Sequence, residues 1–159
     1  MRPEITDAYG NATGREVARR PGWFSKLLPA PVVRRSLSVS LVAPDEFVVG
    51  EPQRFALRVK NRLPAPVAVS LPTSRVWGWR IDGYEEADDR PIDPPTQRRV
   101  VAFANRETRT FVGQWDGHLR RSSSDGDRWE PVPGNRTLSA YLATDPPVEA
   151  ETTVVVRTG

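Results

Sequence analysis

Proline is the residue type that most constrains how this chain folds. Sixteen of the 159 residues are proline, and they are spread along the chain. Proline cannot donate a backbone hydrogen bond, and it is excluded from helix interiors and from central strands. Long helices are therefore excluded over most of the sequence, and the ordered elements are expected to be short strands that end at turns.

From residue 36 onward, apolar residues recur at every second position, which is typical of half-buried strands. Phe55, Leu57 and Val59, for example, are separated by single residues and flanked by Arg54 and Lys60. The same spacing predicts eight strands, at residues 37–41, 55–60, 67–71, 76–81, 99–104, 108–116, 138–142 and 148–157. Seven to eight short strands with turns between them predict an all-β, immunoglobulin-like Greek-key β-sandwich.

The chain divides by composition into two parts. Residues 36–157 are expected to form the sandwich, and residues 1–35 are expected to be a basic, partly disordered N-terminal extension. Within the sandwich, residues 84–96 are acidic and rich in proline, and residues 117–135 are polar. Both segments are predicted to be long loops, which is where a rigid scaffold usually carries its binding residues.

The charge of the chain also follows this division. Residues 1–35 contain seven basic and three acidic side chains, whereas the rest contains sixteen basic and seventeen acidic ones. The body is thus close to neutral, which argues against binding to nucleic acid. The chain has no cysteine, which excludes disulfides and cysteine-based zinc sites and is compatible with a cytoplasmic location.

The N-terminal extension contains one short apolar segment between basic pairs. Trp23, Phe24, Leu27 and Leu28 are spaced to share one face of a helical turn, which Pro29 and Pro31 are expected to end. Two interpretations stay open: the turn docks on an anionic membrane surface or in a partner groove, or it folds back over an edge of the sandwich.

An export signal is not expected in this N-terminal extension. The pair Arg19-Arg20 raises the question of a twin-arginine signal, but Lys26 and Pro29 interrupt the apolar stretch that such a signal needs.

The sequence offers no convergent set of catalytic residues. His118 is the only histidine, and it lies near Asp116 and three serines in a segment predicted to be a loop, which lacks the rigid nucleophile turn of a serine hydrolase. The acidic residues of segment 84–96 do not have the spacing of a calcium loop. We therefore expect no catalytic residue, no metal site and no cofactor.

Four tryptophans of the predicted sandwich allow two interpretations. Trp77, Trp79, Trp115 and Trp129 could form an aromatic platform for sugars or a peptide, or they could pack in the core. Trp77 and Trp115 lie on well-patterned strands and are expected in the core. Trp129 lies in a polar segment and is expected either to be exposed or to cap an end of the sandwich.

Three stretches resemble a known family. They are FALRVKN at 55–61 followed by a turn and PVAV at 66–69, then ETRTFVGQWD at 107–116, and then PGNRTLSAYL at 133–142. In this order they resemble the intracellular proteinase inhibitor family of the BsuPI type, across residues 36–157. Asn105 is taken to replace a glycine of the family in the turn before Glu107, since asparagine also tolerates the left-handed conformation.

This resemblance implies an immunoglobulin-like sandwich and an inhibitor activity, although no reactive-site motif can be carried over. We therefore expect a non-enzymatic interaction module with a protein partner, and its oligomeric state stays open. The alternative is an accessory domain docked to a membrane surface or a protein through its N-terminal segment. The candidate partner-binding residues are Trp23, Phe24, Leu27, Leu28, Tyr84, Glu85, Glu86, His118 and Trp129.

Overall fold

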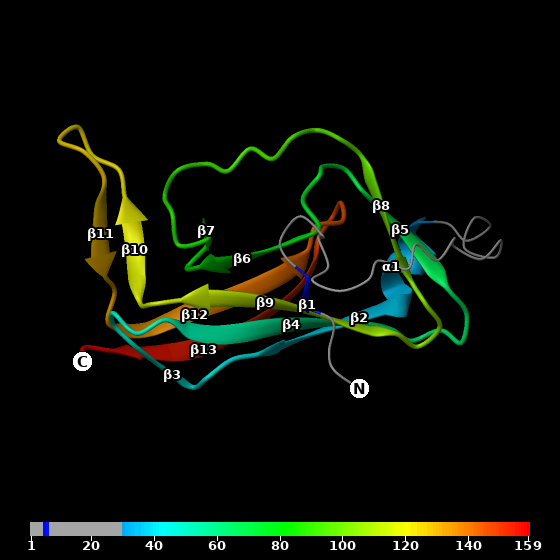
Figure 1. The fold of residues 1–159 in the computed structure, drawn as a ribbon, viewed down its shortest axis with the longest axis horizontal. Coiled ribbons are helices and arrows are strands. Elements are labelled where there is room, and N and C mark those ends of the chain that lie inside the picture. The colour runs from blue at the N-terminus through cyan, green and yellow to red at the C-terminus, as the bar shows by residue number, and fades with distance from the viewer. Residues whose placement is uncertain (1–4, 7–29) are drawn as a thin grey trace.

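The computed structural model describes residues 5–6 and 30–159, whose strands form two packed sheets (Figure 1). The first sheet has the order β1 (Ile5–Thr6), β9 (Thr108–Trp115), β4 (Gln53–Asn61) and β2 (Leu37–Val42). The second has the order β3 (Glu46–Val48), β13 (Val148–Arg157), β12 (Gly134–Leu142), β6 (Trp77–Ile81) and β7 (Tyr84–Glu85). Two strand pairs complete the structure: β5 (Val67–Leu71) with β8 (Arg99–Phe103), and β10 (His118–Arg121) with β11 (Arg128–Pro131).

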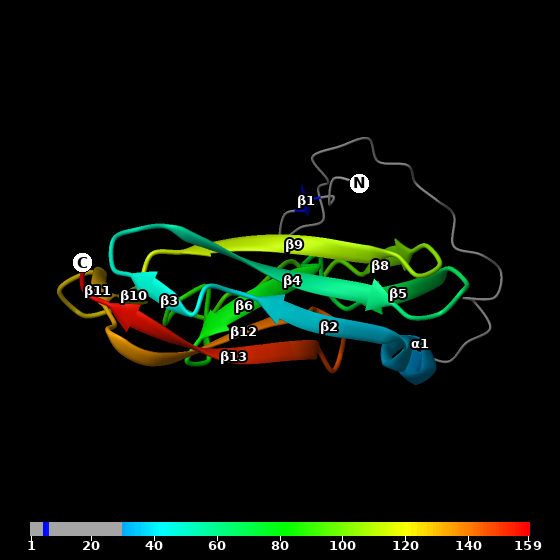
Figure 2. The same ribbon diagram turned by 90° about the horizontal axis from the view of Figure 1, so that it is seen from below.

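All eight strands predicted from the alternating pattern are present, as β2, β4, β5, β6, β8, β9, β12 and β13. The prediction of an immunoglobulin-like Greek-key sandwich is confirmed. Figure 2 shows that the two small strand pairs lie at opposite ends of the molecule, with β5, β8 and the helix α1 (Ala30–Ser36) at one end and the β10–β11 hairpin at the other.

The prediction of two long loops is partly wrong. Segment 84–96 begins with β7, and segment 117–135 contains the whole β10–β11 hairpin and the start of β12. These short strands escape pattern analysis because they bury little: Leu119 is the one buried residue of the hairpin, and all four residues of β11 are exposed. An alternating apolar signal cannot arise where neither face of a strand is covered.

The helix α1 begins at Ala30 and contains Pro31, a proline that was expected to end a helical turn. Pro31 is the second residue of α1, and proline is tolerated in a first turn because the N–H groups there have no partner within the helix. Val33 is only 3% exposed and belongs to the core, while Arg34 donates a 2.8 Å hydrogen bond to the backbone oxygen of Asp145. The helix thus packs on the sandwich, and the boundary predicted at residue 36 falls on its last residue.

The core lies between the two sheets and is rich in aromatic residues. Inward positions of β4, β9, β6, β12 and β13 supply it, with fully buried Leu57, Phe111, Ile81 and Leu138. Three aromatic pairs cross the interior: Phe47 with Trp115, Phe55 with Trp79 and Trp77 with Phe111, at ring centroid distances of 5.3, 5.1 and 5.7 Å. The expectation that Trp77 and Trp115 pack in the core is confirmed.

Asn61 ends β4 and joins two turns. It is fully buried, and its amide nitrogen donates to the backbone oxygens of Ala65 and Ala104, at 2.8 and 3.0 Å. Its side-chain oxygen accepts a hydrogen bond from the backbone N–H of Leu63. The asparagine that ends the FALRVKN stretch is therefore a structural residue, which satisfies backbone groups that the turns would otherwise leave unpaired.

The residue that takes the left-handed conformation before Glu107 is Arg106, with a φ of 53°, so the expectation placed on Asn105 is wrong. Asp82 and Gly83 form a tight turn. Both residues have positive φ, at 49° and 86°, and they connect β6 to β7 as a two-residue hairpin loop. That geometry matches a type I′ turn, which favours an Asp-Gly pair.

Candidate functional site

A groove lies between the sandwich and the β10–β11 hairpin. Its volume is about 500 Å³, which falls in the range of roughly 300–1,000 Å³ that is usual for small-molecule sites. Residues from β6, β9 and β11, from the turns just before β4 and just after β9, and from the segment after β7 line it: Pro52, Trp79, Glu86, Ala87, Gln114, Trp115, Asp116 and Trp129. We call this feature the Trp groove.

Three tryptophans reach the groove from three different strands. Trp79 is half-buried on the inner face of β6, where its ring meets Phe55 edge to face. Trp115, the last residue of β9, is 4% exposed, and its Nε1 donates a 2.7 Å hydrogen bond to the backbone oxygen of His118. Trp129 is 58% exposed, which is the first of the two alternatives that the sequence left open. The groove therefore has a buried tryptophan on one side and an exposed one on the other.

The polar side chains of the groove are two carboxylates and one amide. Glu86 forms an ion pair with the buried guanidinium of Arg75. Asp116 accepts a 3.1 Å hydrogen bond from the backbone N–H of His118 and lies 3.2 Å from the Nδ1 atom of the same histidine. Gln114 is exposed at the rim. Both carboxylates thus have a protein partner yet remain about 40% exposed, at 40% and 43%.

The hairpin that carries Trp129 is held against the segment after β7. The backbone N–H of Arg120 donates to the oxygen of Ala87 at 2.7 Å, and the N–H of Asp89 donates to the oxygen of Arg120 at 3.1 Å. Around this bridge lies a cluster of Asp88, Arg90, Arg120 and Asp127, which we call the hairpin clamp.

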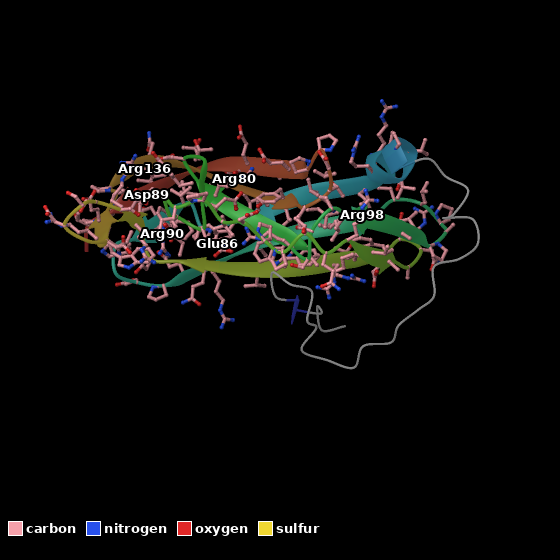
Figure 3. All side chains as sticks on the ribbon, turned by 90° about the horizontal axis from the view of Figure 1, so that it is seen from above. Arg80, Glu86, Asp89, Arg90, Arg98 and Arg136 are labelled. Carbon is pink, nitrogen blue, oxygen red and sulfur yellow. The ribbon has the colours of Figure 1, made fainter. Side chains whose placement is uncertain are left out.

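The clamp is electrostatic. The side-chain hydrogen bond from Arg90 holds the pKa of Asp88 below its ordinary value. Hydrogen bonds from the backbone and the hydroxyl of Ser122 do the same for the pKa of Asp89. Figure 3 shows Asp89, Arg90 and Glu86 in the half of the molecule that holds the hairpin, with Arg98 in the other half. Trp129 is therefore positioned by charged groups rather than by a packed core.

A second polar cluster covers the outer face of the second sheet. The Tyr141 hydroxyl donates to the Glu85 carboxylate at 2.8 Å, and that carboxylate also binds Arg75 and Arg80, at 3.2 and 2.6 Å. Burial, and then the hydrogen bond and charge of Glu85, raise the pKa of Tyr141 to about 12.

Gly78 makes room for this ring on the neighbouring strand. A Cβ atom at Gly78 would lie 2.4 Å from the Tyr141 hydroxyl oxygen, a distance that real Cβ atoms do not tolerate. Glycine inside a strand often marks such a close approach.

Five of the nine candidate partner-binding residues lie near the hairpin, in two different environments. Glu86 and Trp129 line the Trp groove, and His118 contacts Asp116 at its edge. Tyr84 instead accepts a 3.1 Å hydrogen bond from Arg121, and Glu85 is occupied by the Tyr141 cluster. Trp23, Phe24, Leu27 and Leu28, with the helical turn predicted for them, lie outside the described residues.

The Ser/His/Asp arrangement near His118 does not assemble. The Ser122 hydroxyl donates to Asp89, and the Ser123 hydroxyl donates to the backbone oxygen of Gly126. Over residues 30–159, no three His, Asp or Glu side chains gather in a way that could hold a metal ion.

Sequence reasoning identified the tryptophans but not the groove. Trp79, Trp115 and Trp129 were three members of the suggested aromatic platform, whereas Trp77 is buried beneath Phe111. Gln114 and Asp116 were not singled out as site residues. The sequence indicated only that they flank Trp115 at the end of a predicted strand. That position becomes part of a site only once the β10–β11 hairpin folds beside it.

The fold and the groove define an immunoglobulin-like β-sandwich that carries an aromatic groove at its hairpin end. The chain belongs to a family of unknown function, DUF7974, whose model matches residues 25–157. The comparison with curated proteins gave no match. Within the described part of the chain, no helix has the length and apolar character that crossing a membrane requires.

Solved structures with similar folds are distant. A CARDB domain from Pyrococcus furiosus, in complex with di-metal ions, is 15% identical with a TM-score of 0.46, over 77% of this chain and 94% of the other. A β-glucosidase from Listeria innocua, in complex with isofagomine, is 15% identical with a TM-score of 0.48, over 77% of this chain. The present chain spans only 16% of that enzyme's length.

Proposed function

We propose that this protein is a binding module, acting without catalysis, and that its ligand occupies the Trp groove. The observation that carries the proposal is Trp129, a large aromatic side chain that is 58% exposed on a structured hairpin. Exposed aromatic rings that line a concave site, together with a few polar groups, are typical of binding sites.

The scaffold around the groove supports this function. Trp79 and Trp115 are fixed by aromatic packing in the core, so one wall of the groove is formed before any ligand arrives. The opposite wall, with Trp129, rests on the hairpin clamp. A preformed wall lowers the entropic cost of binding, and a wall on a lightly anchored hairpin can adjust to its ligand.

Nuclear magnetic resonance of the indole N–H groups tests this proposal on the full chain. The protein contains five tryptophans, so an ¹⁵N-labelled sample gives five indole signals that variants can assign. We expect that a panel of oligosaccharides, extended peptides and organic cations contains ligands that shift the Trp79 and Trp129 signals saturably. A panel in which no compound shifts either signal would overturn the groove as the binding site.

Peptidase inhibition is the second candidate, and one observation supports it. The β10–β11 hairpin projects away from the sandwich (Figure 1), and its tip at residues 122–127 is exposed, so the tip could enter a peptidase cleft. Incubation with a panel of serine peptidases would show inhibition at micromolar concentration. Ser124→Trp at the tip should abolish it, whereas Val100→Trp on β8 should not.

Docking through the N-terminal segment is proposed from the sequence alone, together with a cytoplasmic location. Co-sedimentation of the full chain with anionic vesicles tests it, and a double variant, Trp23→Glu with Leu27→Glu, should weaken the association. Trp129→Glu serves as a control of the same kind at the other aromatic site. Cell fractionation tests the location independently.

A further inference from the structure

We infer that the Trp groove takes a neutral carbohydrate chain, an inference that rests on the proposed binding function and specifies its ligand. Three features of the groove lead to this class of ligand: the open face of Trp129, the protein contacts that the two carboxylates already make, and the surplus of hydrogen-bond acceptors.

Trp129 offers a flat apolar surface of the kind that a sugar ring can cover. Its cross-strand neighbour Arg120 places its guanidinium 5.8 Å from the centre of the indole ring on one side. Because Trp129 nevertheless remains more than half exposed, its other face is open to solvent. The C–H faces of a pyranose ring are apolar while its rim carries hydroxyls, so stacking on an indole buries apolar area and leaves the rim free to hydrogen-bond.

The charges around the groove exclude ions as the preferred ligand. Glu86 is paired with Arg75, and Asp116 accepts a hydrogen bond from the backbone N–H of His118. At Glu86, an organic cation would therefore compete with Arg75, which is already in place. An anion would meet two carboxylates, which repel it. A ligand without net charge avoids both costs.

The polar groups of the groove call for a ligand that donates hydrogen bonds. Glu86 and Asp116 together present carboxylate oxygens with free acceptor capacity, and the Gln114 amide adds one acceptor and two donors. Sugar hydroxyls can donate to all of these groups. A proline-rich peptide, the other common ligand of aromatic grooves, lacks backbone N–H donors and would leave the carboxylates desolvated without partners.

Titration of the full chain with neutral oligosaccharides tests the inference. The probes are soluble gluco-, xylo-, manno- and chito-oligosaccharides of three to six units, followed by the five indole signals and by calorimetry. We expect at least one series to shift the Trp129 and Trp79 signals. Trp129→Ala should then weaken binding about tenfold, the effect of losing roughly 1.4 kcal/mol of stacking and burial.

Matched variants separate the groove from the rest of the hairpin. Arg128 precedes Trp129 on β11, and successive side chains of a strand point to opposite faces. Arg128→Ala should therefore leave the affinity unchanged. Gln114→Leu keeps the size of its side chain but removes the amide, and it should weaken binding by about fivefold, the loss of one hydrogen bond.

The same titration contains the outcomes that overturn the inference. If a polyproline peptide or a quaternary ammonium compound shifts the indole signals and no oligosaccharide does, the carbohydrate inference is wrong while the groove remains a binding site. If no probe shifts them, the proposed function fails as well. Binding that Trp129→Ala and Arg128→Ala weaken equally would place the sugar elsewhere.

Discussion

The two ends of the sandwich are closed by different physical means. At one end, which we call the apolar end, α1, β5 and β8 meet through buried Val33, Val67 and Phe103. At the other end, the β10–β11 hairpin has Leu119 as its one buried residue and is held by the hairpin clamp. Apolar burial gives stability that does not depend on the charge state of side chains, whereas contacts between charged groups are weakened by salt and by protonation.

This difference indicates which end of the sandwich opens more easily by local unfolding. Local opening free energies are lowest where few apolar contacts and many exposed hydrogen bonds hold an element. By that criterion the hairpin end opens first, and the Trp groove has its one adjustable wall there. Four predictions test the contrast, beginning with the largest expected effect.

Phe103→Ala should be severe, because it empties a fully buried position at the apolar end. Large-to-small changes of a buried phenylalanine cost about 3–5 kcal/mol. Urea unfolding of the full chain measures the loss. Val100→Ala, on the same strand but 63% exposed, is the control and should change stability by less than about 0.5 kcal/mol. Comparable losses in the two variants would refute the packing assigned to this end.

Asp88→Asn should have a smaller and local effect at the hairpin end. It removes the carboxylate that binds Arg90 and lies 3.7 Å from Arg120, so the free energy of unfolding should fall by less than about 1 kcal/mol. Hydrogen exchange should show the Arg120 amide, which donates to Ala87, exchanging faster, with the amides of β5 and β8 unchanged. Asp125→Asn at the hairpin tip is the control. If it accelerated exchange of the Arg120 amide equally, the effect would not come from the hairpin clamp.

Acid should loosen the hairpin end before the apolar end. The folded pKa values of Asp88 and Asp89 are lowered, so both carboxylates contribute stability above the ordinary carboxyl pKa of about 4. That contribution is lost as the pH falls through the lowered values, because protonation removes the charges that the hydrogen bonds from Arg90 and Ser122 stabilise. Amide spectra recorded from pH 6 to pH 2 should change first on β10 and β11. A simultaneous change in both ends would argue against the prediction.

Trp129→Ala should have the smallest effect on stability, below about 0.5 kcal/mol, because the side chain is already mostly in solvent. Thermal unfolding measures it. The same substitution is expected to weaken ligand binding about tenfold, so it separates stability from function at this end. A loss of stability comparable to that of Phe103→Ala would mean that Trp129 serves the fold.

The sequence allowed the sandwich to be predicted because each long strand covers one face. β4 and β13 alternate more buried with more exposed residues, and Trp77 and Trp115 occupy inward positions that pattern alone indicates. The hairpin and β7 were missed for the converse reason, since neither buries a face. Their pairing depends on ion pairs and backbone bonds between residues far apart in the sequence, such as Ala87 with Arg120.

The candidate site could be predicted only in part for the same reason. Trp129 and Glu86 attracted attention as residue types in polar segments, and both do line the groove. The acidic segment itself was expected to be a loop without a metal site, and its sequence did not indicate that Glu85 and Asp88 form ion pairs with arginines. Sequence composition shows that charges are present, but not which of them neutralise one another across the fold.

The contact between Gly78 and Tyr141 has a consequence for how the family varies. The two residues face each other on β6 and β12, and the tyrosine ring occupies the space of the missing side chain. Relatives that keep an aromatic residue at the second position are expected to keep glycine at the first, whereas relatives with a small residue there are free to carry any strand former. The residues at the two positions should therefore co-vary among members of the family, because they share a single steric contact.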